Sequence, residues 1–109
     1  MANTLSLLVE AVPQLAKELS NGLEALGETD LAQQVAGLKI VDRCHCGDDF
    51  CATIYTAPTP KGAYGAGHEN VRLNVAEGEI ILDVVDRKIM CVEVLYRDDL
   101  RQALLALWP

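Results

Sequence analysis

The longest stretch of the chain that could bury apolar side chains on both faces covers residues 79–95. Branched aliphatic residues dominate it, and such residues favour β-strands. They are Ile80, Ile81, Val84, Val85, Ile89, Val92 and Val94. Residues 86–88 (DRK) interrupt the stretch with the polar side chains that a tight reversal requires. The pattern predicts a central β-hairpin, with the rest of a sheet built outward from it.

The first third of the chain shows helical periodicity instead, because apolar residues recur every three or four positions. They are Leu5, Leu8, Val9, Val12, Leu15, Leu19, Leu23 and Leu26. Pro13 suits the first turn of a second helix, so two helices are expected to meet near it. Gly27 suits the left-handed position that ends this helix. Thr29 or Asp30 is expected to cap a short third helix, which Gly37 ends.

After this third helix the pattern changes to the alternation of β-strands. Residues 38–46 and 50–56 are predicted to form a first hairpin around a turn at residues 47–49. Residues 57–67 contain two prolines and three glycines, which predicts the longest loop and a candidate binding surface. Residues 68–75 alternate between apolar and polar side chains and are predicted to form one more strand.

A last helix is predicted near the C-terminus, capped by Asp98 or Asp99. Its apolar side would dock on the sheet and consists of Leu100, Ala103, Leu104, Leu107 and Trp108. The whole pattern predicts one α+β domain over residues 1–109, with N-terminal helices and a meander of about five antiparallel strands. The C-terminal helix is expected to pack on one sheet face.

Composition narrows the classes of partner. The chain has 109 residues, the usual size of one domain, and carries 16 acidic and nine basic residues for a net charge of −7. That charge would repel a phosphate backbone, so nucleic acid is not expected as a partner, whereas a basic protein is favoured. No apolar run approaches the ~20 residues that cross a bilayer, and no export signal is recognised. The sequence therefore predicts a cytoplasmic protein without a membrane partner, whose four cysteines are reduced or bound to a metal.

The densest group of metal-binding residue types lies in residues 43–51 (RCHCGDDFC). Cys44, Cys46 and Cys51 could meet across the predicted turn and supply three of the four ligands that zinc prefers. His68 or Cys91 would be a distant fourth. Against this hypothesis, the C-x-C-x4-C spacing matches no standard zinc pattern, and strand alternation could turn Cys51 to the opposite face. Buried, reduced cysteines are the preferred interpretation, and a zinc site is the alternative.

A thiol enzyme is a further alternative. Such an enzyme needs a thiol, a histidine beside it and a third group that orients the histidine. Cys51 with His68 and with Asp48 or Asp49 is the best available set, although no local signature marks it.

Glu93 stands apart from the other acidic residues. Those fit solvated faces and helix caps, whereas Glu93 interrupts an otherwise apolar strand. It is expected to pair with Arg72 or Arg97, or to lie at the rim of the sheet.

The two strands of the central hairpin carry a family resemblance. Residues 78–84 (GEIILDV) followed by residues 89–95 (IMCVEVL) resemble the strand pair of small bacterial β-meander proteins of unknown function. In those proteins a Leu-Asp-Val strand precedes an Ile/Val-Glu-Val/Ile-Leu strand, with a glycine in the turn where this chain has residues 86–88. The resemblance covers the last third of the chain. It implies a β-meander and transfers no activity and no functional residue.

These observations favour a small, acidic, non-enzymatic binding protein. No catalytic constellation stands out, and the strands offer more apolar surface than one helical layer covers, which favours a protein partner or self-association as a homodimer. The alternatives are a zinc-binding domain built on Cys44, Cys46 and Cys51, and a thiol enzyme that uses Cys51 and His68.

Overall fold

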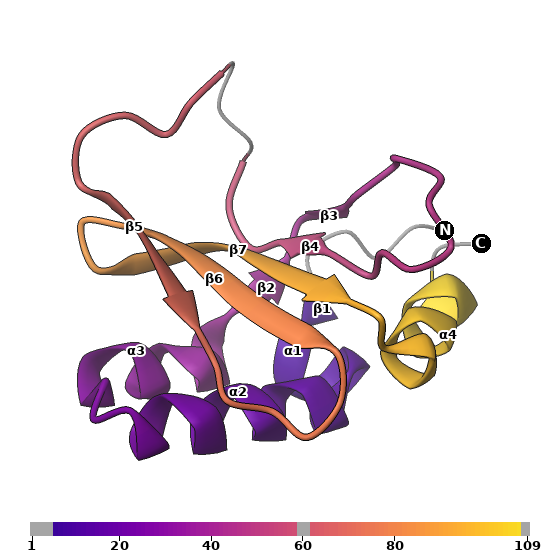
Figure 1. Ribbon diagram of the computed structural model, residues 1–109, viewed down its shortest axis with the longest axis horizontal. Helices are drawn as coiled ribbons and strands as arrows, with labels where there is room; N and C mark the ends of the chain where they lie inside the picture. Colours follow the sequence, from indigo (N-terminus) through magenta and orange to yellow (C-terminus); the bar gives the residue numbers. More distant parts are fainter. Residues whose placement is uncertain (1–5, 59–61, 108–109) are drawn as a thin grey trace.

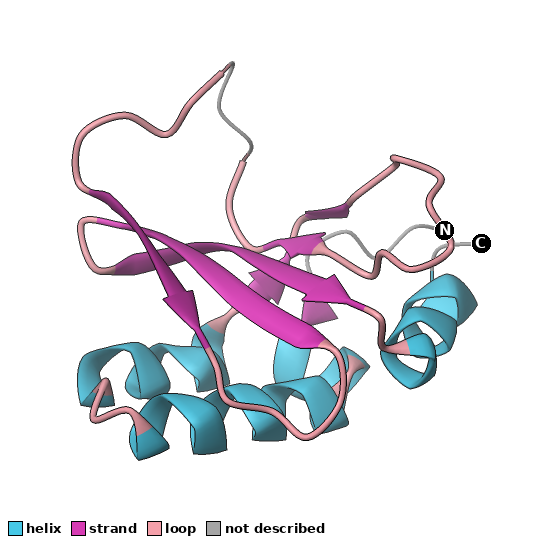
Figure 2. Ribbon diagram, viewed as in Figure 1, coloured by secondary structure: helices cyan, strands magenta, loops and turns pink. Residues whose placement is uncertain are grey.

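The computed structural model of the protein describes residues 6–58 and 62–107. In chain order (Figure 1) the elements are β1 (Ser6–Leu7), α1 (Leu8–Ala11), α2 (Pro13–Ala25), α3 (Thr29–Gln34), the 3-10 helix η1 (Val35–Gly37), β2 (Lys39–Ile40), β3 (Asp42–Arg43), β4 (Ile54–Tyr55), β5 (His68–Arg72), β6 (Glu79–Val85), β7 (Lys88–Leu95) and α4 (Asp98–Leu107). Figure 2 shows the predicted α+β class, with helices at both ends of the chain and an antiparallel sheet between them. None of the described helices has both the length and the apolar composition needed to span a membrane.

The predicted central hairpin is confirmed as β6 paired with β7. The turn between them consists of Asp86 and Arg87, which both have left-handed backbone, with φ of 51° and 64°. Positive φ at both central residues defines a type I′ turn, whose twist matches that of the flanking strands. Lys88, predicted to lie in the turn, is the first residue of β7.

The order of the five strands differs from a simple meander at one connection. The sheet has the order β3-β4-β7-β6-β5, so β5, β6 and β7 form a meander but β4 pairs with β7 rather than β5. The connection from β4 to β5 therefore crosses the width of the sheet. This arrangement places β7 between two partners, which satisfies the backbone groups of a strand with four buried residues out of eight.

The helices α2 and α3 form a layer on one face of the sheet (Figure 1). Leu15, Leu19 and Leu23 of α2 are fully buried, as the apolar stripe predicts, while Leu26 is 48% exposed. Leu100 and Leu104 carry α4 into the same core, while Leu107 is 43% exposed. Leu5 and Trp108, which were expected to join these apolar faces, lie outside the described residues.

Two expectations for the N-terminal helices were wrong. Residues 6 and 7 form β1, which pairs with β2, so the first helix begins only at Leu8. The N-cap of α3 is Glu28 rather than Thr29 or Asp30, and it makes no capping hydrogen bond through its side chain. Pro13 does occupy the first turn of α2, as predicted.

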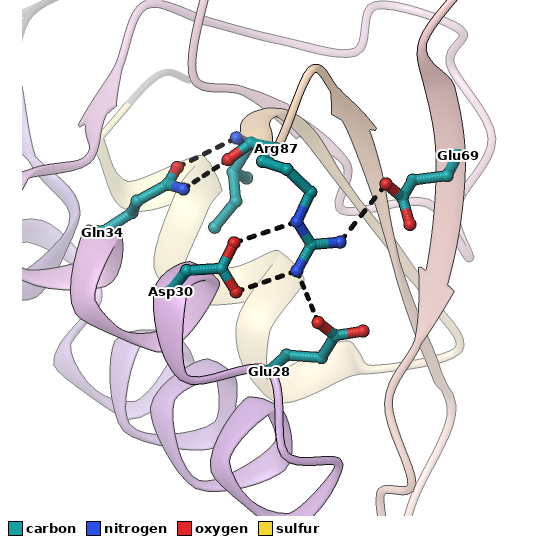
Figure 3. Close-up of polar contacts among 6 residues, drawn as sticks. Glu28, Asp30, Gln34, Glu69 and Arg87 are labelled. Carbon is teal, nitrogen blue, oxygen red and sulfur yellow. Dashed lines mark hydrogen bonds and ion pairs between the residues drawn. The ribbon is translucent and has the colours of Figure 1, made fainter.

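Hydrogen bonds and ion pairs connect the turn of the central hairpin to the helical layer (Figure 3). The guanidinium of Arg87 donates to both oxygens of Asp30 at 2.8 and 2.9 Å, to Glu69 at 3.2 Å and to Glu28. Gln34 donates to the carbonyl of Arg87 at 2.6 Å and accepts from the backbone N–H of Ile89 at 3.1 Å. The positive charge of Arg87 offsets the repulsion among the three carboxylates that it binds. We assign this cluster a structural role.

Candidate functional site

The end of the β3–β4 hairpin brings three thiols together. The Sγ atoms of Cys44, Cys46 and Cys51 all lie within 4.8 Å of one another. The backbone N–H of Cys44 donates to Thr53 at 2.9 Å, and that of Cys51 donates to Asp48 at 3.3 Å, which closes the loop between them. The structure therefore joins three of the four residues expected to bind zinc.

Strand alternation does not separate Cys51 from the other two thiols, because the three cysteines lie in irregular backbone. β3 ends at Arg43 and β4 begins only at Ile54, so residues 44–53 do not follow the two-residue period. An isolated bridge between Cys51 and Leu95 and a backbone hydrogen bond from Ala52 to Val94 at 2.8 Å hold this segment against the end of β7. The expectation of buried cysteines is wrong for this cluster, since Cys46 is exposed and the other two are half-buried.

The two proposed fourth ligands do not join the cluster. His68 begins β5 at the opposite edge of the sheet from β3, and its Nε2 lies 2.8 Å from Asp83 Oδ1. Cys91 is a buried residue within β7. Within the described part of the chain, three side chains form the group able to hold a metal ion.

The thiols differ in how readily they ionise. Burial raises the pKa of Cys44 to about 11, and hydrogen bonds with the other two thiols support this rise. Burial also opposes ionisation of Cys51, but hydrogen bonds with Thr53 and the neighbouring thiols outweigh it, so the pKa of Cys51 is lowered. Cys51 therefore forms a thiolate more readily than Cys44 does, and the thiolate is the form in which cysteine attacks electrophiles and binds metals.

An open groove of about 450 Å³ extends from these thiols across the outer sheet face, which strand alternation turns away from α2 and α3. Among its lining residues are Cys44, Cys51, Tyr64, Asp83, Cys91 and Glu93. Tyr64 comes from the predicted long loop, and its ring centroid lies 5.0 Å from that of His68. Pro60 and its two neighbours in that loop lie outside the described residues.

Asp83 and Glu93 form a carboxylate pair in this groove that sequence reasoning missed. A hydrogen bond with Asp83, together with burial, raises the pKa of Glu93 to about 7. Burial opposes ionisation of Asp83, but hydrogen bonds with Glu93, His68 and Asn70 outweigh it and lower the pKa of Asp83. Once Asp83 is known to lie opposite Cys91, strand alternation places Glu93 diagonally across from it on the same face.

The predicted partners of Glu93 are engaged elsewhere. Arg72 pairs with Glu79 at 3.2 Å, and Arg97 pairs with Glu18 and Asp99. The expectation that Glu93 pairs with one of these arginines is therefore wrong.

No protein-family model, curated protein or solved structure matches this chain. The resemblance of the central hairpin to small bacterial β-meander proteins stays a prediction. The function of the protein is accordingly argued from the chemistry of its own residues.

Proposed function

We propose that the protein binds a zinc ion through Cys44, Cys46 and Cys51. The observation that carries this proposal is the approach of the three Sγ atoms to within 4.8 Å of one another. Thiolates that bind zinc at 2.3 Å in tetrahedral geometry lie about 3.8 Å apart. A small rotation of the cysteine side chains would bring the sulfur atoms from the observed separation to this one. Cys46 is the most exposed of the three.

The donor set supports a thiophilic metal. Three thiolates favour zinc or copper(I) over magnesium and calcium, which prefer oxygen ligands. The thiols must lose their protons when the metal binds, and the lowered pKa of Cys51 favours that loss. Three protein ligands leave one coordination position for water or an external ligand, as in catalytic rather than structural zinc sites.

A reducing compartment suits this proposal, because the thiols must stay reduced to bind metal. We accordingly place the protein in the cytoplasm. The thiol-enzyme alternative has less support, because the base that it requires, His68, lies at the opposite edge of the sheet from β3 and hydrogen-bonds to Asp83 there.

The proposal is tested by the metal content of protein purified without added zinc or chelator, measured by native and denaturing mass spectrometry. We expect one zinc per chain, lost in C46S and retained in C91S. Cys91 is the matched control because it is buried outside the cluster. Protein that carries no metal and takes up none when micromolar zinc is added would rule the proposal out.

A second proposal is association with another protein, and an exposed aromatic pair supports it. Phe50 and Tyr96 stack with ring centroids 5.2 Å apart and are 39% and 62% exposed. Aromatic side chains are enriched at interfaces, and the net charge of −7 favours a basic partner. The self-association form of this proposal predicts a dimer in sedimentation equilibrium that F50S/Y96S weakens. A wild-type protein that stays monomeric over a wide concentration range would contradict that form.

A further inference from the structure

The arginines of this chain fall into two groups. Arg72, Arg87 and Arg97 each pair with at least one carboxylate. Arg43 and Arg101 have no carboxylate partner within the residues that the structure describes. The positive charges of these two arginines are therefore available to an anion from outside the described chain.

Both of these arginines line the same small pocket. It lies between the end of the β3–β4 hairpin and α4, has a volume of about 50 Å³, and is also lined by the three clustered cysteines. This volume has room for a few water-sized groups, so it suits a small ion and excludes a nucleotide. Arg43 lines the pocket from β3 and Arg101 from α4, so its two basic residues come from separate elements.

Arg43 carries a buried donor without an acceptor. Its Nε is buried and has no hydrogen-bond partner among the residues that the structure describes, while its Nη1 donates to the carbonyl of Cys44 at 3.4 Å. A buried guanidinium N–H without an acceptor is unfavourable, and native proteins rarely leave one unpaired. A rotation of the Arg43 side chain that turns this N–H into the pocket would let an oxygen of a bound ligand supply the missing acceptor.

The charge of the pocket favours an anion. Among the described lining residues Asp48 is the one carboxylate, so in the metal-free chain with its three thiols protonated the two guanidiniums outnumber it. Guanidinium groups bind phosphate and carboxylate oxygens through paired hydrogen bonds. Two such groups on different elements suit a tetrahedral oxoanion, which offers oxygens in several directions, better than a planar carboxylate.

We propose that the pocket between the β3–β4 hairpin and α4 binds a small tetrahedral oxoanion through Arg43 and Arg101. This site goes beyond the zinc proposal, because its two charged donors are not metal ligands. It is therefore present in the metal-free chain, and its existence can be tested separately from zinc binding.

The test is a titration of the metal-free, reduced full chain with inorganic phosphate, at an ionic strength held constant with chloride. The Nε–Hε signals of the arginines are followed by NMR. We expect saturable shifts at Arg43 and Arg101 but not at Arg72, whose exposed side chain pairs with Glu79. R43Q and R101Q should each weaken phosphate binding about tenfold or more, as the loss of a charge-assisted bond implies. R72Q is the matched control and should bind as the wild type does.

D48N should change the phosphate affinity in the opposite direction. It removes the negative charge of Asp48 from the pocket lining, so phosphate binding should tighten. The backbone spectrum shows whether each variant folds. If R43Q does not fold, R43K replaces it, and the loss of the planar fork should still weaken binding. Shifts that do not saturate, phosphate affinity unchanged in both arginine variants, or acetate binding as tightly as phosphate would overturn the proposal.

Discussion

At the scale of single residues, Tyr96 has the least expected backbone conformation in the described part of the chain. Its φ is +60°, a left-handed value that is costly for a bulky side chain. The surroundings hold it there, because its N–H donates to Phe50 at 2.8 Å and its ring stacks on the ring of Phe50. The bend at Tyr96 turns the chain from the end of β7 towards α4. Backbone strain is thus stored at the exposed aromatic pair, where the chain passes from β7 to α4.

The strain at Tyr96 predicts that glycine is more stabilising than alanine at this position, the reverse of the order found within a helix. Y96A and Y96G both lose the ring, but alanine keeps the left-handed penalty and glycine does not. Y96G should therefore be more stable than Y96A by about 1 kcal/mol in urea unfolding. At Asn21, an exposed residue of α2, the order should be the ordinary one, with N21A more stable than N21G by about 1 kcal/mol. The same order at both positions would show that Tyr96 carries no strain.

Two glycines with left-handed backbone separate strain from collision. Gly27 and Gly78 have φ of 77° and 65°, but an added Cβ meets nothing within 4 Å at Gly27. At Gly78 it would collide with the backbone oxygens of Leu95 and Tyr96. G27A should lower the free energy of unfolding by about 1 to 2 kcal/mol, from strain alone. G78A should lower it by about 3 kcal/mol or more, because collision adds to strain. Equal losses of unfolding free energy in G27A and G78A would contradict the expected collision at Gly78, in the turn that precedes β6.

At the scale of elements, periodicity predicted the helices and the central hairpin but not the strand order. The leucine stripe of α2 and the branched residues of β6 and β7 are local patterns, and each specifies one element. The pairing of β4 with β7 depends on which edge of the hairpin is left free, and no local pattern encodes that choice. The carboxylate pair was missed for the same reason, since Asp83 and Glu93 meet only after β6 and β7 align.

The pairing of β6 with β7 makes stability depend on pH. The folded state raises the pKa of Glu93 from 4.5 to about 7, so it binds this proton more tightly than the unfolded chain does. The stability that Glu93 contributes is therefore fully present below pH 4.5 and is lost as the pH rises through 7. The free energy of unfolding of the wild type, relative to E93Q, should fall between about pH 5 and about pH 8.

E93Q is a close control, because its amide keeps a donor for Asp83 but does not titrate. D83N removes the carboxylate that is the first cause of the raised pKa, so the fall between these pH values should also weaken in that variant. Parallel pH profiles for the wild type and E93Q would show that the two carboxylates do not share a proton.

At the scale of the whole molecule, the pocket beside the thiol cluster was predicted only in part. Some of its residues lie close together in the sequence, and others lie far apart. Cys44, Cys46 and Cys51 lie close together in the sequence, so their meeting could be foreseen from one predicted turn. Arg101 reaches the same pocket from a helix some 50 residues further along the chain, and its approach depends on how α4 docks. Docking of α4 thus decides whether the hairpin carries a thiol cluster alone or a thiol cluster beside an anion pocket.

Arg97 is the side chain that ties this docking to the N-terminal layer. It is 5% exposed and bonds both oxygens of Glu18 at 2.7 Å, and both oxygens of Asp99 at 2.9 and 3.0 Å. It therefore connects α2 to the start of α4 across 79 positions of sequence.

R97K keeps the charge of this side chain but loses the planar fork that makes the paired bonds. It should lower the free energy of unfolding by about 2 kcal/mol, because a largely buried network is left partly unsatisfied. R72K is the matched control, since Arg72 is 63% exposed and makes one contact, so its loss should stay within about 0.5 kcal/mol. Both values come from urea unfolding followed by far-UV circular dichroism. Equal losses would mean that α4 is held by its buried leucines alone, and that Arg101 reaches the anion pocket without help from Arg97.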